Sequence, residues 1–101
     1  MKKIMLACSA GMSTSLLVEK MRKSAKERGL DVEIEALPVA EAERRLDEYD
    51  VVMLGPQIRY KLEDMRKAAD GRTPVDVIKM TDYGMMNGKN VLDAALAVIG
   101  K

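Results

Sequence analysis

Short apolar runs alternate four times with helical patterns along this chain, and this alternation restricts its fold more than any other feature. In chain order the apolar runs are 2–7, 32–37, 51–54 and 75–78, and the helical patterns are about 13–28, 38–47, 58–69 and 89–100. Strands that alternate with helices form parallel sheets, because each helix returns the chain by a right-handed crossover. The sequence therefore predicts an α/β fold with a four-stranded parallel sheet, helices on both faces, and a loop over 79–88.

The polarity of the runs indicates where two of the strands lie. Residues 32–37 alternate apolar and acidic side chains, as an edge strand does, whereas residues 4–7 are all apolar, as in a strand covered on both faces. We expect the order 2-1-3-4, a three-layer sandwich of the phosphatase-I-like or flavodoxin-like kind. Ligands of such sheets bind beyond the carboxyl ends of strands 1 and 3. The chain of 101 residues is long enough for one domain, 1–101.

The only cysteine, Cys8, follows the first apolar run and precedes a loop of small and hydroxyl residues. Gly11 permits a positive φ, and four hydroxyl residues follow the cysteine closely. A strand, a loop and a helix N-terminus in this order aim backbone N–H groups at one spot, which suits a phosphate and favours a thiolate. We predict that Cys8 is a nucleophile that carries a phosphoryl group; the alternative is a cysteine that only ends a buried strand.

Absent residue types and motifs exclude several functions. The chain has no histidine, which removes Cys–His and Ser–His–Asp catalysis and the commonest metal ligand, and we expect neither a metal nor a cofactor. Neither G-x-G-x-x-G nor G-x-x-x-x-G-K-[ST] occurs. A net charge of +1 without a basic run argues against nucleic acid as a partner. The single cysteine and the lack of a long apolar span predict a cytoplasmic protein, and a charged surface predicts a monomer.

The position six residues after Cys8 separates two kinds of cysteine chemistry. Cysteine-dependent phosphatases place an arginine there, and this chain has Thr14. Without the guanidinium, hydrolysis of a phosphoester loses its bidentate charged clamp. A thiolate that accepts a phosphoryl group but hydrolyses it poorly is a carrier. Two alternatives stay open: a phosphatase or arsenate-reductase-like enzyme that uses the same loop, and a non-catalytic anion-binding module.

The run from Cys8 to Leu17, with Gly55-Pro56-Gln57 and the later Tyr83-Gly84 and Asn87-Gly88, resembles the enzyme IIB component of the lactose/cellobiose/chitobiose type from the bacterial sugar phosphotransferase system. The resemblance covers essentially the whole chain. It implies a cytoplasmic phosphotransferase that accepts phosphate from a phosphohistidine of enzyme IIA onto Cys8. Cys8 would then pass the phosphate to a β-linked disaccharide held by the membrane component, enzyme IIC. The missing histidine agrees with this, because the partner would supply it.

The resemblance also implies roles for particular residues. Cys8 corresponds to the phosphorylated cysteine. Gln57 and Tyr83 match motif positions and are candidates for contacts behind the phosphate; the alternative for Tyr83 is that it only caps the sheet edge. Met12 and the pair Met85-Met86 fit either a partner surface or simple packing. Because enzyme IIC mainly chooses the sugar, the sequence does not separate cellobiose, chitobiose, lactose and other β-glucosides. The expected phosphate-binding loop consists of Ser9, Ala10, Gly11, Met12, Ser13, Thr14 and Ser15.

Overall fold

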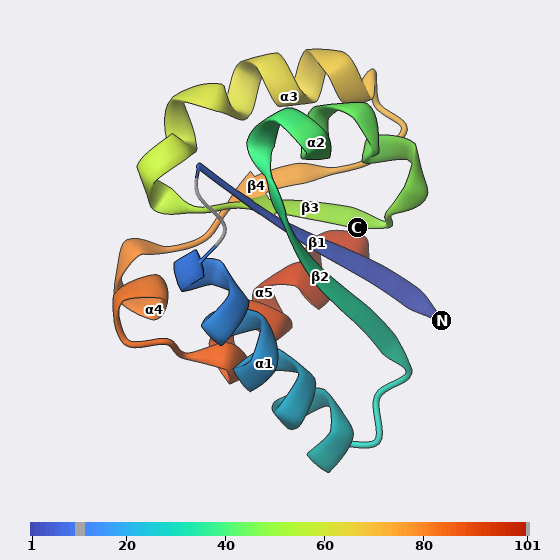
Figure 1. Ribbon diagram of the computed structural model, residues 1–101. Helices are drawn as coiled ribbons and strands as arrows, with labels where there is room; N and C mark the ends of the chain where they lie inside the picture. The colour runs from blue at the N-terminus through green and yellow to red at the C-terminus, as the bar shows by residue number, and fades with distance from the viewer. Residues whose placement is uncertain (10–11, 101) are drawn as a thin grey trace.

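A four-stranded parallel sheet forms the centre of the computed structural model, which describes residues 1–9 and 12–100 (Figure 1). The order of the strands in the sheet is β2-β1-β3-β4, and all three pairings are parallel. The predicted order is confirmed, and so is the edge position of the second strand. The strands are β1 (Lys2–Cys8), β2 (Val32–Pro38), β3 (Val51–Leu54) and β4 (Val75–Val77).

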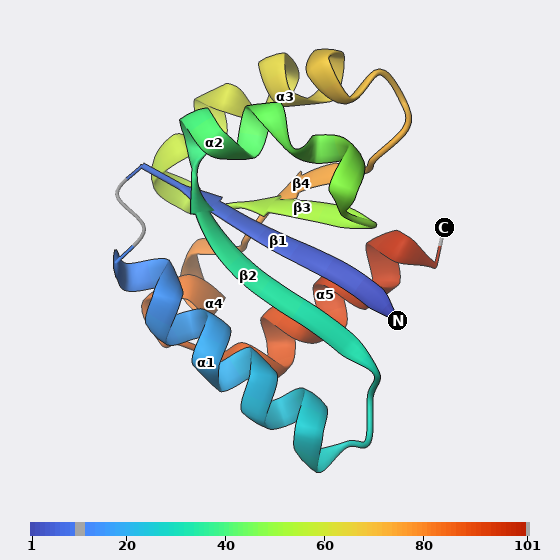
Figure 2. The same cartoon turned by 45° about the vertical axis from the view of Figure 1, so that its right-hand side comes forward.

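Helices cover both faces of the sheet, as Figures 1 and 2 show. One face carries α1 (Met12–Glu27), α4 (Met80–Gly84) and α5 (Gly88–Ile99), and the other carries α2 (Val39–Arg44) and α3 (Leu62–Ala69). Two 3₁₀ turns, η1 (Leu46–Glu48) and η2 (Pro56–Lys61), follow α2 and β3. The predicted three-layer arrangement is therefore confirmed.

Three segments differ from the sequence-based prediction. Residues 79–88 are not all loop, because they contain the five residues of α4. The predicted helix 38–47 is divided into α2 and η1, and the predicted helix 58–69 starts as the 3₁₀ turn η2, with a non-helical Ile58 inside it. Elements of one or two turns gain little from local propensity, so tertiary packing decides whether they form.

The side chains of β1 alternate between two cores. Ile4 and Leu6 belong to the core under α1 and α5, whereas Met5 and Ala7 belong to the core under α2 and α3. All four side chains are fully buried. Since a strand covered on both faces needs apolar side chains at every position, this burial explains why the first run is uninterrupted.

Two glycines support the helices on the α1 face. Gly29, with φ +66°, ends α1 in a Schellman motif: its N–H donates to the Lys26 carbonyl at 3.2 Å, and the Leu30 N–H donates to the Ala25 carbonyl at 2.9 Å. Gly88 begins α5 against the backbone of α1, where a Cβ would lie 2.6 Å from the carbonyl carbon of Lys20. The close approach places α5 firmly against the helix that follows Cys8.

Candidate functional site

Cys8 is the last residue of β1 and lies at the carboxyl edge of the sheet, between the ends of β2 and β3. It is paired with Pro38 of β2, and the preceding Ala7 is paired with Leu54 of β3. Only 4% of Cys8 is exposed. This is the switch point of the sheet, because the connections that follow β1 and β3 run to opposite faces. As the last residue of β1, Cys8 lies at this point.

The thiol of Cys8 is held by the hydroxyl of Thr14. Thr14 Oγ1 donates a hydrogen bond to Cys8 Sγ at 2.9 Å, and the Thr14 side chain is completely buried. The first turn of α1 carries Thr14 back over the end of β1. Since a thiolate is a stronger hydrogen-bond acceptor than a thiol, this contact suits a sulfur that reacts as a nucleophile. Thr14 thus occupies the position of the phosphatase arginine, and its hydroxyl binds the sulfur of Cys8.

The N-terminus of α1 adds a positive electrostatic environment to the same edge. The helix begins at Met12, and its first turn contains no acidic residue, so no carboxylate of that turn competes for the free N–H groups. Ser9 and Ser15 are exposed beside this end. Ala10, Gly11 and the side chains of Met12 and Ser13 also belong to the expected phosphate-binding loop, and they lie outside the described part of the structure.

The turn after β3 forms a second wall beside Cys8. The Gly55 N–H donates to the Ala7 carbonyl at 2.8 Å, which continues the pairing of β3 with β1. A Cβ on Gly55 would lie 3.9 Å from Cys8 Cβ and 3.1 Å from Gln57 Oε1. The structure therefore brings Gln57, which is exposed, to the same edge as Cys8.

A cleft of about 780 Å³ lies next to this wall, between η2 and α4, and we refer to it as the η2–α4 cleft. Tyr83 is buried in the core under α1 and α5 and also lines this cleft. The two methionines of the pair Met85-Met86 differ in burial. Met85 is exposed, whereas Met86 packs against the core and lines the cleft. Other lining residues are Gln57, Arg59, Tyr60 and Met80. Sequence reasoning missed Arg59, Tyr60 and Met80, because their segments were predicted only as the start of a helix and as a loop.

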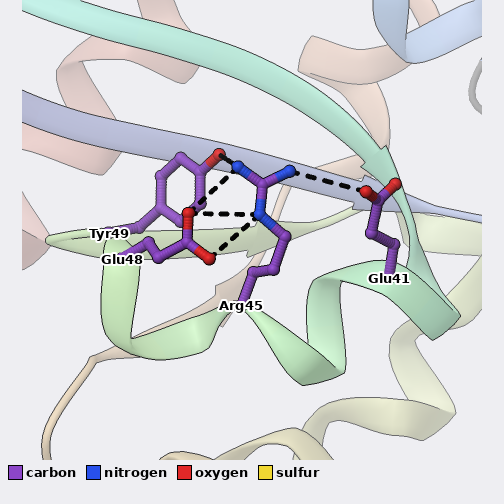
Figure 3. A network of polar contacts seen from close by, with 4 residues as sticks. All are labelled: Glu41, Arg45, Glu48 and Tyr49. Atoms are coloured by element: carbon purple, nitrogen blue, oxygen red, sulfur yellow. Dashed lines mark hydrogen bonds and ion pairs between the residues drawn. The ribbon is translucent and has the colours of Figure 1, made fainter.

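A charged network lies between α2 and the start of β3 (Figure 3). Arg45 donates to the Glu48 carboxylate at 3.1 Å and to the Tyr49 hydroxyl at 3.2 Å, and it pairs with Glu41 at 3.5 Å. Burial, followed by the hydrogen-bonded carboxylate of Glu35, raises the pKa of Tyr49 to about 12. These groups satisfy one another, which is typical of a structural network.

Two further observations concern metal binding and membrane-spanning helices. The described side chains include no group of three or more histidine, cysteine, aspartate or glutamate residues placed to hold a metal ion. No helix in residues 1–9 and 12–100 has the length and apolar character needed to cross a membrane.

Comparison with known sequences identifies a family that matches most of the chain. The family model of the lactose/cellobiose-specific IIB subunit of the phosphotransferase system matches residues 3–94. The galactose-specific EIIB component of Lactococcus lactis subsp. cremoris is 52% identical over 100 residues, and the cellobiose-specific EIIB component of Lactococcus lactis subsp. lactis is 51% identical; each alignment covers 93% of both chains. The lactose-specific EIICB component of Streptococcus mutans is 31% identical over 67 residues, which are 66% of this chain and 12% of that protein.

Solved structures show the same architecture. The cellobiose-specific IIB component from Borrelia burgdorferi superposes with a TM-score of 0.81 at 36% identity and covers 98% of this chain and 92% of its own. The lactose-specific IIB component domain from Streptococcus pneumoniae has a TM-score of 0.86 and covers 96% of both chains. At 16% identity, the second match shows the fold alone.

Proposed function

The chain belongs to the lactose/cellobiose-specific IIB family of the sugar phosphotransferase system, and from this we propose that it carries the phosphoryl group on Cys8. It is a phosphotransferase component for sugars of the lactose/cellobiose type. One observation carries the proposal for Cys8: its sulfur accepts the buried Thr14 hydroxyl at 2.9 Å, at a helix N-terminus without carboxylates in its first turn.

The chemistry consists of two phosphoryl transfers. First, the Cys8 thiolate attacks the phosphorus of a phosphohistidine on enzyme IIA; the S–P bond forms, the N–P bond breaks, and the electron pair stays on the imidazole. Next, a sugar hydroxyl held by enzyme IIC attacks the phosphorus, so that the O–P bond forms, the S–P bond breaks and the thiolate returns. The hydroxyl proton passes to a base on the acceptor side. The chain has no histidine, which fits a mechanism in which enzyme IIA supplies the phosphohistidine and this chain supplies the cysteine.

The loop supplies the electrostatic part of both steps. The amides at the start of α1, with the Ser9, Ser13 and Ser15 hydroxyls, would bind the phosphoryl oxygens, and the Gln57 amide lies within the same edge. Thr14 acts on the sulfur, which is the attacking atom in the first step and the leaving atom in the second. Because fixed dipoles need no reorganisation during transfer, such a loop lowers the barrier in both directions.

The proposed partners are enzyme IIA as the phosphate donor and enzyme IIC with its bound sugar as the acceptor. The name of the Streptococcus mutans relative joins a IIC and a IIB part in one protein, which supports the second partner. The proposal includes a monomeric carrier that works at the cytoplasmic side as one domain, 1–101. Which β-linked disaccharide receives the phosphate depends on enzyme IIC.

Intact-mass analysis tests the carrier role. The chain is incubated with phosphoenolpyruvate, the general phosphotransferase proteins and enzyme IIA, in parallel with Cys8→Ala. We expect one phosphoryl group on the natural chain and none on the variant, whose thermal unfolding midpoint serves as the control for folding. Phosphate on the Cys8→Ala protein, or none on either protein while the partners are active, would refute the proposal.

The phosphatase alternative has its own assay. A phosphatase loop would turn over p-nitrophenyl phosphate in the isolated chain. Because Thr14 occupies the place of the arginine and binds sulfur, we expect no turnover above that of Cys8→Ala.

A further inference from the structure

β2 and β4 are the outer strands of the sheet, so one long side of each has no neighbouring strand in the described part of the structure (Figure 2). The Lys2 N–H donates to the Asp31 carbonyl at 3.2 Å, which turns the odd-numbered residues of β2 towards β1. The even-numbered residues Val32, Ile34 and Ala36 therefore turn their N–H and C=O groups to the other side, which we call the open side of β2. Backbone groups on such a side can pair with a strand of another chain.

A side chain of α1 occupies the middle of the open side of β2. Arg22 reaches from α1 to β2 and donates two hydrogen bonds to the Ile34 carbonyl, from Nε at 3.0 Å and from Nη2. It also lines both hollows along this strand, one that includes Ala36 and one that includes Met1. The guanidinium thus covers the central carbonyl of the open side, which a further strand would need as an acceptor.

The outer strand at the opposite end of the sheet is closed in a similar way. The Ile78 N–H donates to the Leu54 carbonyl at 2.8 Å, so the even-numbered residues of this segment face β3 and Val77 faces outwards. The Val77 N–H donates to the Asp76 carboxylate at 2.8 Å. A carboxylate therefore covers a donor at β4, and a guanidinium covers an acceptor at β2. Since β4 has three residues and β2 has seven, β2 is the strand that could bind a partner strand of useful length.

The register of β2 suits pairing with a second copy of the same strand. In an antiparallel pair about a two-fold axis at Ile34, the two Ile34 residues exchange both N–H···O=C bonds, and the neighbouring even-numbered residues pair in the same way. Arg22 occupies the carbonyl that this central pair requires. Glu33 would face the second copy's Glu35, and like charges directly opposite each other destabilise paired strands.

We propose that Arg22 keeps this protein monomeric by closing the open side of β2 against a second copy. Both copies must break their hydrogen bonds from Arg22 to Ile34 before the central pair can form, so the cost of opening applies twice. The carboxylates of Glu33 and Glu35 add a smaller repulsion. Pairing at β2 does not use the Cys8 sulfur, so the test of this role is independent of phosphoryl transfer.

Sedimentation equilibrium tests the closure of β2. We expect the natural chain to be monomeric, and we expect Arg22→Met, which keeps an apolar stem but has no donor, to raise the dimer association constant about tenfold or more. Lys23→Met is the matched control, because Lys23 is the next exposed residue of α1 and points to another side of the helix. Adding Glu33→Lys to Arg22→Met should raise the constant about threefold further, because an ammonium would then face the second copy's Glu35.

Amide hydrogen exchange locates the pairing. In Arg22→Met, exchange of the Ile34 N–H should slow as the protein concentration rises, whereas in the natural chain it should not depend on concentration. The thermal unfolding midpoint shows whether each variant is folded, and Arg22→Ala takes the place of Arg22→Met if the latter does not fold. The proposal is wrong if the folded Arg22 variant stays monomeric, even with a lower midpoint, because Arg22 would then only brace α1. It is also wrong if Lys23→Met or the natural chain dimerises equally, or if the dimer shows no slower exchange at Ile34.

Discussion

The two edges of the sheet use their polar groups in opposite ways. At the amino edge, the Lys3 N–H donates to the Asp50 carboxylate at 2.8 Å, and the Asp50 N–H donates to the Lys3 carbonyl at 2.8 Å. Arg45 is enclosed by Glu48 and Tyr49 in the same region. At the carboxyl edge, Arg59 has no ion pair among the described residues, and large apolar side chains are exposed.

This contrast shows where the fold keeps interactions for a partner. Polar groups that are already paired with one another contribute to the stability of the fold and are not available to a partner. An uncompensated charge or an exposed apolar side chain, in contrast, forms favourable interactions only when a partner binds. Substitutions at the two edges should therefore affect different measurements, and the following predictions test this separation.

Removal of the Thr14 hydroxyl should have the largest effect. Thr14→Val keeps the shape of the side chain but removes the hydroxyl that donates to Cys8 Sγ, and a hydrogen bond to a charged group contributes about 1.5–3 kcal/mol. We expect phosphoryl transfer to slow about tenfold to a hundredfold, measured by intact mass at short times. Thr14→Ser, which retains the hydroxyl, is the control and should keep most of the rate. Equal rates for both variants would exclude a role for this contact.

A substitution at Gly88 tests the packing of α5 against α1, which supports the carboxyl edge, rather than the chemistry of that edge. In Gly88→Ala, the new Cβ would meet the backbone of Lys20 and Met21 at 2.6–2.7 Å, so α5 must move away from α1. We expect a loss of about 1–3 kcal/mol in the free energy of unfolding, measured with urea. Gly84→Ala is the matched control, because nothing lies within 4 Å of its added Cβ. A loss of equal size in both variants would contradict the packing argument.

Thr73 tests the amino edge. Its buried hydroxyl donates to the Leu46 carbonyl at 2.9 Å, and Thr73→Val leaves that carbonyl without this donor. We expect the free energy of unfolding to fall by about 1–2 kcal/mol while the rate of phosphoryl transfer to Cys8 stays unchanged. Slower transfer in this variant would show that the edges are coupled.

The last expected effect is a pH dependence at Tyr49, which does not change stability near neutral pH and is expressed only above pH 10. Its pKa rises from the ordinary 10 to about 12 in the folded chain, chiefly because the side chain is buried. A raised folded-state pKa stabilises the protein fully below pH 10, and this contribution disappears as the pH rises towards 12. Urea unfolding from pH 9 to 12 should therefore show the advantage of the natural chain over Tyr49→Phe shrinking across this range. A difference in the free energy of unfolding that stays constant from pH 9 to 12 would contradict the raised pKa of Tyr49.

Much of the fold follows from local patterns. The period-2 pattern of residues 32–37 predicts an edge strand, and the unbroken apolar run before Cys8 predicts a central one; both are confirmed. Since chain direction and handedness restrict parallel sheets to few arrangements, these patterns also place Cys8 at the switch point. The nucleophile could thus be predicted from the sequence, although its role stays a prediction.

The short elements could not be predicted in the same way. The helix α4 has five residues, one of them the buried Tyr83, and a single turn is too short to show a helical period. The start of the predicted helix 58–69 is the 3₁₀ turn η2 with a non-helical Ile58, and its Arg59 and Tyr60 line the cleft opposite α4. The cleft arises only when these two segments, far apart in the chain, are brought together.

The sequence by itself determined the sheet order, the presence of helices on both faces of the sheet and the position of Cys8, because each depends on residue spacing within one element and on general rules of chain connection. The tertiary structure alone decided that Thr14 binds sulfur, that Gln57 lies at the same edge as Cys8, and that Arg59 lines a cleft with no ion pair among the described residues. Those facts depend on distances between side chains from different elements, which packing sets and local periodicity does not encode.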